Sequence, residues 1–162
     1  MRFKINLRID AALTGNADAA PRLIRAAARA ALDHEAAPPP GELTIVLTDD
    51  AALRRLNRDH LGHDDPTDVL SFPSDEIDPE TSTRYFGDIA ISLPRARAQA
   101  EAGSHPASAE VQLLVVHGVL HLLGHDHTGP KAKARMWAAQ AEILQQLNAL
   151  ITGPPIGEGS AH

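Results

Sequence analysis

Three histidines in the second half of the chain have the spacing of a metal site. Residues 117–127 read HGVLHLLGHDH. On an α-helix, residues four apart lie on one face and one turn apart, so His117 and His121 can reach a single ion. Gly124 is the residue type expected where such a helix ends in a left-handed turn, after which the chain can return to present His127. Three neutral imidazoles with an open fourth position form a catalytic zinc site, so the segment predicts one Zn²⁺ per chain.

The same spacing occurs in a large class of zinc peptidases, in which a glutamate directly follows the first histidine and acts as general base. In this chain that position is Gly118. General acid–base catalysis contributes about two to four orders of magnitude in rate, so a peptidase of this class without its base would be very slow. The pattern therefore favours a metal-dependent hydrolase of another substrate, with ordinary core or surface histidines as the alternative.

The composition of the 162 residues limits the class of protein. The length predicts a single domain at residues 1–152, and the Gly/Pro-rich residues 153–162 are expected to form a disordered tail. The absence of cysteine excludes disulfides and thiolate ligands, so a metal must be held by nitrogen and oxygen. There is no apolar run long enough to span a membrane and no apolar signal core near the start, so a cytoplasmic location is expected. The net charge of −6 gives no general attraction to nucleic acid, although a bound Zn²⁺ would add positive charge locally.

Hydrophobic periodicity predicts the elements that would position the histidines. Four strands are indicated, at residues 3–9, 43–48, 69–72 and 86–92. Five helices are indicated, at residues 18–34, from 49 onward, and at 93–102, 106–123 and 131–150. Residues 60–68 are expected to form a polar loop and residues 74–84 an irregular acidic excursion.

The order of these elements, β-α-β-α-β-β-α-α-α, predicts a single-domain α+β fold with a mixed, mainly four-stranded sheet packed with helices. Its β-α-β pieces favour some parallel pairing. Residues 111–123 are apolar nearly all round, so the metal-bearing helix is expected to be buried at the centre of the domain.

Three segments, taken in order, resemble the YbeY endoribonuclease family, the bacterial rRNA maturation factors. Residues 117–127 resemble the family signature, PTDVLSFP at 66–73 resembles its second motif, and FGDI at 86–89 resembles its third. Leu56-Asn57 precedes the second motif, and Met136 and Glu142 are in register in the last helix, so the resemblance covers roughly residues 43–145.

The resemblance implies a zinc-dependent, single-strand-specific endoribonuclease. Proteins of this family act in the maturation of the 16S rRNA 3′ end and in ribosome quality control, so single-stranded RNA and the small ribosomal subunit are the implied partners. The family's zinc ligands, through which catalysis proceeds, correspond to His117, His121 and His127.

Two positions depart from the family pattern. His125 stands where the family usually has tyrosine, and it is expected to point outward or to be hydrogen-bonded rather than to act as a fourth ligand. Leu61 stands where the family has a loop arginine, regarded as functionally important through phosphate contact. Arg58 and His63 lie nearby and are candidates to replace it. Cleavage of RNA is therefore expected to be weaker than is usual for the family.

Further polar residues are candidates for positioning or for substrate contact. Asp88 and Asp126 could orient a ligand histidine through its other ring N–H, the alternatives being a turn residue and a solvated loop acid. Thr67, Asp68 and Ser71 could line the same cleft or act as turn formers. Two helical sets of arginines could contact RNA or form solvated faces: Arg22, Arg25 and Arg29, and Arg54, Arg55 and Arg58. The other histidines are expected to be isolated surface residues: His34, His60, His63, His105 and His162.

Three functions remain open from the sequence. The first is a metal-dependent ribonuclease acting on rRNA, and the second is a hydrolase of another substrate, such as a peptide or small ester. The third is a ribosome-assembly factor in which zinc is largely structural, favoured by the leucine at the arginine position. Imidazole ligands also suit nickel and cobalt, so the ligand set alone does not identify the metal.

Overall fold

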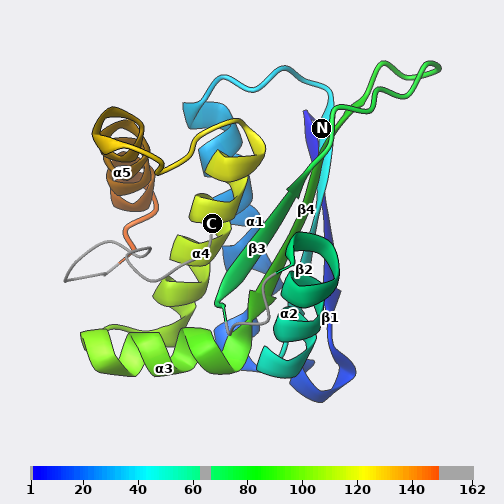
Figure 1. Ribbon diagram of the computed structural model, residues 1–162. Coiled ribbons are helices and arrows are strands. Elements are labelled where there is room, and N and C mark those ends of the chain that lie inside the picture. The colour runs from blue at the N-terminus through cyan, green and yellow to red at the C-terminus, as the bar shows by residue number, and fades with distance from the viewer. Residues whose placement is uncertain (1, 63–66, 150–162) are drawn as a thin grey trace.

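A four-stranded mixed sheet forms the framework of the computed structural model, which describes residues 2–62 and 67–149 (Figure 1). The strands are β1 (Phe3–Ile9), β2 (Gly41–Thr48), β3 (Val69–Pro73) and β4 (Arg84–Ser92), in the spatial order β1-β2-β4-β3. The pairs β1–β2 and β2–β4 are parallel, and β3 pairs antiparallel with β4. The predicted α+β class, four strands and partly parallel pairing are confirmed.

Five α-helices pack around this sheet: α1 (Pro21–His34), α2 (Asp50–Leu56), α3 (Leu93–Gly103), α4 (Ala107–Leu122) and α5 (Pro130–Gln146). Short 3₁₀ turns at Ala11–Leu13 and Ala17–Ala19 join β1 to α1. Helices α1 and α4 cover one face of the sheet, with α5 beyond α4, whereas α2 lies on the other face (Figure 1). No helix in the described residues has the length and apolar composition needed to cross a bilayer.

Helix α4 occupies the centre of the main core, as its uniformly apolar sequence predicts. Its residues pack with side chains of the sheet and of α1, α3 and α5. Gly118 allows a close approach to the sheet, because a Cβ atom at this position would lie only 2.8 Å from Cγ2 of Ile89. The helix is thus fixed in rotation, with residue 118 facing β4.

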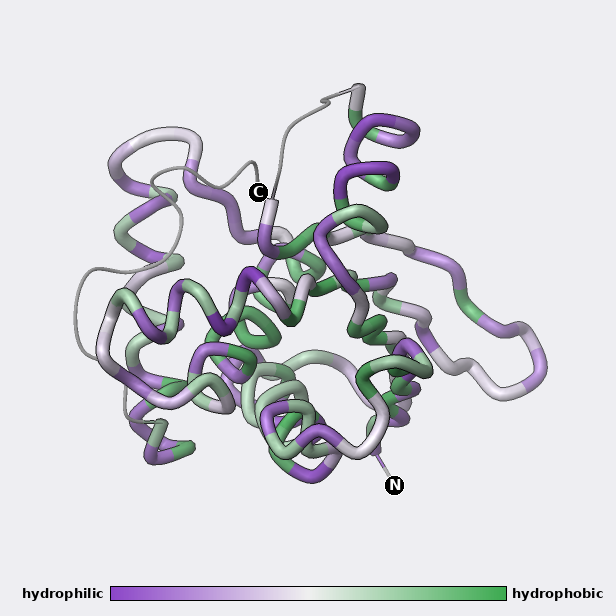
Figure 2. Tube along the Cα trace, turned by 90° about the horizontal axis from the view of Figure 1, so that it is seen from below, coloured by the Kyte–Doolittle hydropathy of each residue, from purple (hydrophilic) through white to green (hydrophobic). Residues whose placement is uncertain are grey.

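A second, smaller apolar cluster lies on the opposite face of the sheet. Leu53, Leu70 and Ala90 form its buried part, and Leu56, Leu61, Phe72 and Val46 pack against it. The chain continues beyond α2 as a π-helical turn, Asn57–Leu61, so the polar loop was expected to begin two residues too early, at residue 60. Figure 2 shows the apolar segments gathered toward the middle of the molecule and the polar segments at its outside.

The connection between β3 and β4 projects from the body of the molecule (Figures 1 and 2). An irregular excursion was expected here, but backbone hydrogen bonds such as Tyr85 N to Glu76 O (2.8 Å) and Asp78 N to Thr83 O (2.9 Å) make it a hairpin. The predicted tail at 153–162 lies outside the described residues, and the domain boundary at residue 152 stays a prediction.

Candidate metal centre

The end of helix α4 returns the chain toward its own last turn. The backbone N–H of Gly124 bonds to the carbonyl of His121 (3.0 Å), and that of His125 bonds to the carbonyl of Leu120 (2.9 Å). These two bonds form a Schellman motif, and Gly124 adopts the left-handed conformation that it requires (φ 100°). The loop after this glycine carries His127 back beside α4, as the sequence predicts.

The three histidines form one cluster in which the candidate ligand nitrogens all lie within 4.8 Å of one another. Their ring centroids are separated by 4.8 Å (His117–His121), 5.3 Å (His121–His127) and 6.0 Å (His117–His127). His117 is fully buried, whereas the other two rings are partly exposed. Nε2 of His127 is buried and has no hydrogen-bond partner within the described ranges. Because an uncoordinated buried imidazole nitrogen is costly, this arrangement fits a bound cation.

Gln140 of α5 fixes the proton of His117, and the sequence analysis missed this residue. Nδ1 of His117 lies 3.0 Å from Oε1 of Gln140, and both side chains are buried. An amide oxygen only accepts, so Nδ1 carries the proton and Nε2 retains a lone pair for a metal. The available signal was a glutamine on the otherwise apolar inner stripe of α5, which contains Met136, Ala139, Ile143 and Leu144.

Asp88, a candidate for that orienting role, points away from the histidines. Side chains alternate between the faces of a strand, and Ile89 packs against α4 at Gly118, so Asp88 lies on the other face. There the Tyr85 hydroxyl donates to its carboxylate (2.5 Å). Burial, reinforced by this carboxylate, raises the pKa of Tyr85. Asp88 therefore lines a separate cavity of about 550 Å³ on the face that carries α2.

Asp126 has a local structural task. Its Oδ1 accepts from the backbone N–H of Thr128 (3.1 Å) and from the Thr128 hydroxyl (2.9 Å). These two bonds lower the pKa of its carboxyl group. The exposed carboxylate thus stabilises the turn that carries His127.

Ser71 of β3 contacts the metal helix directly. Its hydroxyl donates to the carbonyl of Gly118 (3.3 Å), which ties β3 to α4 between the first two histidines. Thr67 is buried and its hydroxyl lies 3.4 Å from the carbonyl of Val69. Asp68 is also buried and accepts from the side-chain amide of Gln99 (3.1 Å).

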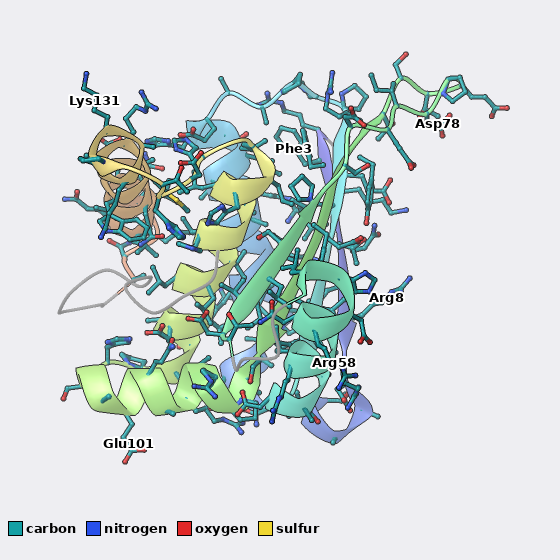
Figure 3. The ribbon with its side chains drawn as sticks, in the orientation of Figure 1. Phe3, Arg8, Arg58, Asp78, Glu101 and Lys131 are labelled. Carbon is teal, nitrogen blue, oxygen red and sulfur yellow. The ribbon has the colours of Figure 1, made fainter. Side chains whose placement is uncertain are left out.

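The residues near the family-arginine position are not brought to the histidine cluster. Leu61 packs against the apolar cluster on the α2 face, and Arg58 pairs with Asp59 (3.0 Å) at the surface. Figure 3 shows Arg58 on the α2 side of the molecule, with Arg8 above it. His63 lies outside the described residues.

The arginines expected to line RNA lie on separate surfaces. One set is on α1 and the other on α2 and the π-helical turn, on opposite faces of the sheet, so they do not form one stripe. Another basic residue, Lys133 of α5, lies over a ring that adjoins the histidine cluster. Lys133 Nζ lies 6.0 Å from the ring centroid of Trp137, and that ring lies 5.7 Å from His117 and 6.0 Å from His127.

Two histidines predicted as isolated surface residues make specific contacts, which corrects that expectation. His105 lies 2.5 Å from Glu110 Oε1, and both side chains are buried at the junction of α3 and α4. Burial raises the pKa of Glu110, and the hydrogen bond with His105 opposes this shift. His34 contacts two carboxylates, Glu35 and Glu142. His125 is hydrogen-bonded to Glu35, in agreement with its expected role outside the ligand set.

Known proteins resemble this chain over most of its length. A family model described as Endoribonuclease YbeY matches residues 8–148. A protein from Chloroflexus aurantiacus named Endoribonuclease YbeY is 43% identical over 150 residues, which is 89% of this chain and 95% of that protein. A protein of the same name from Roseiflexus castenholzii is 50% identical over 113 residues, which is 67% of this chain and 71% of that protein. A solution structure of a Thermotoga maritima protein shares the fold, with a TM-score of 0.56 at 22% identity over 90% of this chain and 88% of that one.

Proposed function

The chain belongs to the YbeY endoribonuclease family, and from this premise we propose that it is a zinc-dependent endoribonuclease specific for single strands. Its proposed task is 16S rRNA 3′ end maturation and ribosome quality control, in the cytoplasm and on the small ribosomal subunit. The main support for the proposal is that three histidines come together at one point. In addition, Gln140 accepts from Nδ1 of His117, which leaves Nε2 of that ring to bind a metal.

The donor set decides which chemistry the site can support. His117, His121 and His127 would hold the ion, and no cysteine is present to favour a closed structural site. Bound Zn²⁺ supplies a Lewis acid for the scissile phosphate and lowers the pKa of a coordinated water. The chain's own part is to orient the ligands and to shape the surroundings. Gln140 orients the ring of His117 by accepting from its Nδ1, and the half-buried ring of Trp137 lies beside two of the ligands.

A phosphodiester substrate requires local positive charge, because the chain as a whole carries −6. Lys133 lies next to Trp137, within one helical turn of it on α5. The ammonium group of Lys133 can attract the RNA backbone, and the indole of Trp137, which lies beside two of the metal ligands, offers an apolar surface for an unpaired base.

A peptidase function is disfavoured by the direction of residue 118. Any side chain at that position would meet Ile89 of β4 rather than the histidine cluster. The glutamate that serves zinc peptidases could therefore not be supplied by simple replacement of Gly118. One observation supports the assembly-factor alternative: Leu61, at the position where the family has arginine, packs into an apolar cluster.

These functions predict different outcomes in one assay. Metal-depleted protein would be reconstituted with zinc and incubated with single-stranded RNA, the matching duplex and casein. The ribonuclease predicts zinc-dependent cleavage of the single strand alone, and loss of that cleavage in His121→Ala. Cleavage of casein would support the peptidase, and zinc binding without any RNA cleavage would support the assembly factor.

A further inference from the structure

Four side chains link the C-terminal end of α1 to the metal loop and to α5. His34 Nδ1 lies 2.7 Å from Glu35 Oε2, and His34 Nε2 lies 2.7 Å from Glu142 Oε2. On the other side of the same carboxylate, His125 Nε2 lies 2.5 Å from Glu35 Oε1. We call these four residues, His34, Glu35, His125 and Glu142, the bridging network. Glu35 is its centre, because each of its oxygens accepts from a different histidine.

The backbone fixes both ends of the Glu35–His125 contact. Helix α1 ends like α4, with N–H bonds from Ala36 to Asp33 (3.1 Å) and from Ala37 to Leu32 (3.0 Å). Glu35 is the last residue before this left-handed turn, and Ala36 adopts it with φ 53°. His125 is the first residue after Gly124, which takes the left-handed conformation at the end of α4. The contact therefore joins two terminated helices 90 residues apart in sequence.

The position of His125 gives this contact a consequence for the metal centre. It lies between Gly124, where α4 ends, and His127, the ligand that the return loop must present. The loop is otherwise held by the Schellman bonds at its start and by the Asp126–Thr128 turn at its end. Between these two points, the carboxylate of Glu35 holds the side chain of His125. The contact is partly buried, since each of the two side chains is 19% exposed.

We propose that Glu35 is a positioning residue of the metal centre, which presents His127 at the correct place by holding His125. This inference rests on the proposed metal site but concerns a residue of α1 that does not touch it. Where the family usually has tyrosine, this chain uses an imidazole, and Glu35 is the acceptor that this imidazole requires.

The test measures zinc affinity by competition with a chromogenic chelator, which needs no RNA substrate. Removal of groups that orient metal ligands typically lowers metal affinity by 10- to 100-fold, and Glu35 acts one residue further away, so Glu35→Ala should lower it by about tenfold. Glu35→Gln keeps an acceptor oxygen and should restore most of the affinity. His125→Tyr, which keeps a donor, should remain near wild type, whereas His125→Phe should match Glu35→Ala.

Two further measurements separate positioning from general damage. Asp33→Ala is the matched control, because Asp33 is an exposed acid on the same last turn. Its carboxylate pairs with Arg2 at the surface (3.4 Å), and its loss should leave zinc affinity unchanged. The double variant Glu35→Ala/His125→Phe should bind zinc no more weakly than either single variant, because both remove one contact. The visible absorption of the Co²⁺ derivative should change in Glu35→Ala and return in Glu35→Gln.

The outcomes divide clearly. Wild-type affinity in Glu35→Ala, or additive losses in the double variant, would overturn the positioning role while leaving the metal site intact. Failure of the wild-type chain to bind zinc at all would overturn the metal site, and the positioning role with it.

Discussion

Gln140 shows how much one uncharged side chain can determine at a metal site. Its amide oxygen accepts from His117, so the neutral imidazole keeps its proton on Nδ1 and presents Nε2. Of the two carboxylates considered for such a task, Asp88 lies on the other face of the sheet and Asp126 accepts from Thr128. The pairing also satisfies a polar atom in an apolar interior, so Gln140 serves stability and ligation together.

We therefore expect Gln140→Leu to weaken zinc binding by about 10- to 100-fold, because the ring of His117 loses its orienting partner. The measurement is chelator competition on the purified variant. Gln140→Glu is the informative counterpart, since it restores an acceptor and adds negative charge behind the ligand. Equal affinities in the wild type and in Gln140→Leu would show that His117 is oriented by packing alone.

Leu61 leads to a prediction with two readouts. From the family pattern we expect Leu61→Arg to raise the rate of RNA cleavage without changing zinc content, because it restores a phosphate-binding cation. Since residue 61 lies on the α2 face, this cation would contact the RNA away from the histidine cluster. The packing of Leu61 against Leu53, Leu70 and Ala90 adds a cost in stability, on the order of 1–3 kcal/mol for a disturbed apolar contact. Urea denaturation measures the loss in the free energy of unfolding, and initial rates of RNA cleavage measure the gain in activity. An unchanged rate in the variant, together with a loss of activity in Arg58→Ala, would assign the role to Arg58.

At the scale of elements, the sequence was most informative where periodicity and capping agreed. The uniformly apolar stretch correctly predicted α4 as the buried central helix, and Gly124 correctly predicted its left-handed end. Alternation predicted four strands, but it could not say which face of β4 would receive α4, so it could not decide whether Asp88 would face the histidine cluster. The π-helical turn after α2 had no signal, because polar residues there suggested a loop.

Contacts between distant segments account for most of what the sequence could not predict. His34 pairs with Glu142 across 108 residues, and His125 pairs with Glu35 across 90. Spacing within one helix or strand says nothing about such pairs, since they depend on how helix ends meet in the folded chain. His34 was expected to be isolated for this reason, and the positioning role of Glu35 could not be inferred.

The bridging network predicts a specific dependence of stability on pH. Hydrogen bonding to Glu142 raises the pKa of His34 above 6.5, although burial opposes it. A raised histidine pKa contributes stability that is present below 6.5 and is lost as the pH rises through the folded-state pKa. Burial would raise the pKa of Glu35, but bonds from His125 and His34 lower it below 4.5, so its contribution is lost only as the pH falls further.

The free energy of unfolding at pH 5.5 should therefore be higher for the wild type than for His34→Gln. The difference should be less than about 1 kcal/mol, because Glu142 is largely exposed. The difference should shrink toward pH 8. Urea denaturation of metal-free protein at several pH values measures it. A difference that stays constant with pH would mean that His34 contributes through packing and not through its charge.

At the scale of the whole molecule, the sheet separates two environments. Helices α1, α4 and α5 enclose the histidine cluster on one face, while the other face carries α2, the Tyr85–Asp88 pair and a cavity of about 550 Å³. The net charge of −6 means that RNA affinity must come from a local field, to which the ion and Lys133 contribute. Binding should consequently weaken with added salt, with a slope set by few phosphate contacts.

The central claim is that one metal ion held by His117, His121 and His127 is required for cleavage of single-stranded RNA. The most direct measurement is a titration of metal-free protein with zinc, in which bound zinc and the initial cleavage rate are determined on the same samples. We predict that the rate rises in proportion to bound zinc and levels off at one ion per chain, and that His121→Ala neither retains zinc nor cleaves. Full cleavage by metal-free protein, or one bound zinc in the wild type without any cleavage, would contradict the account.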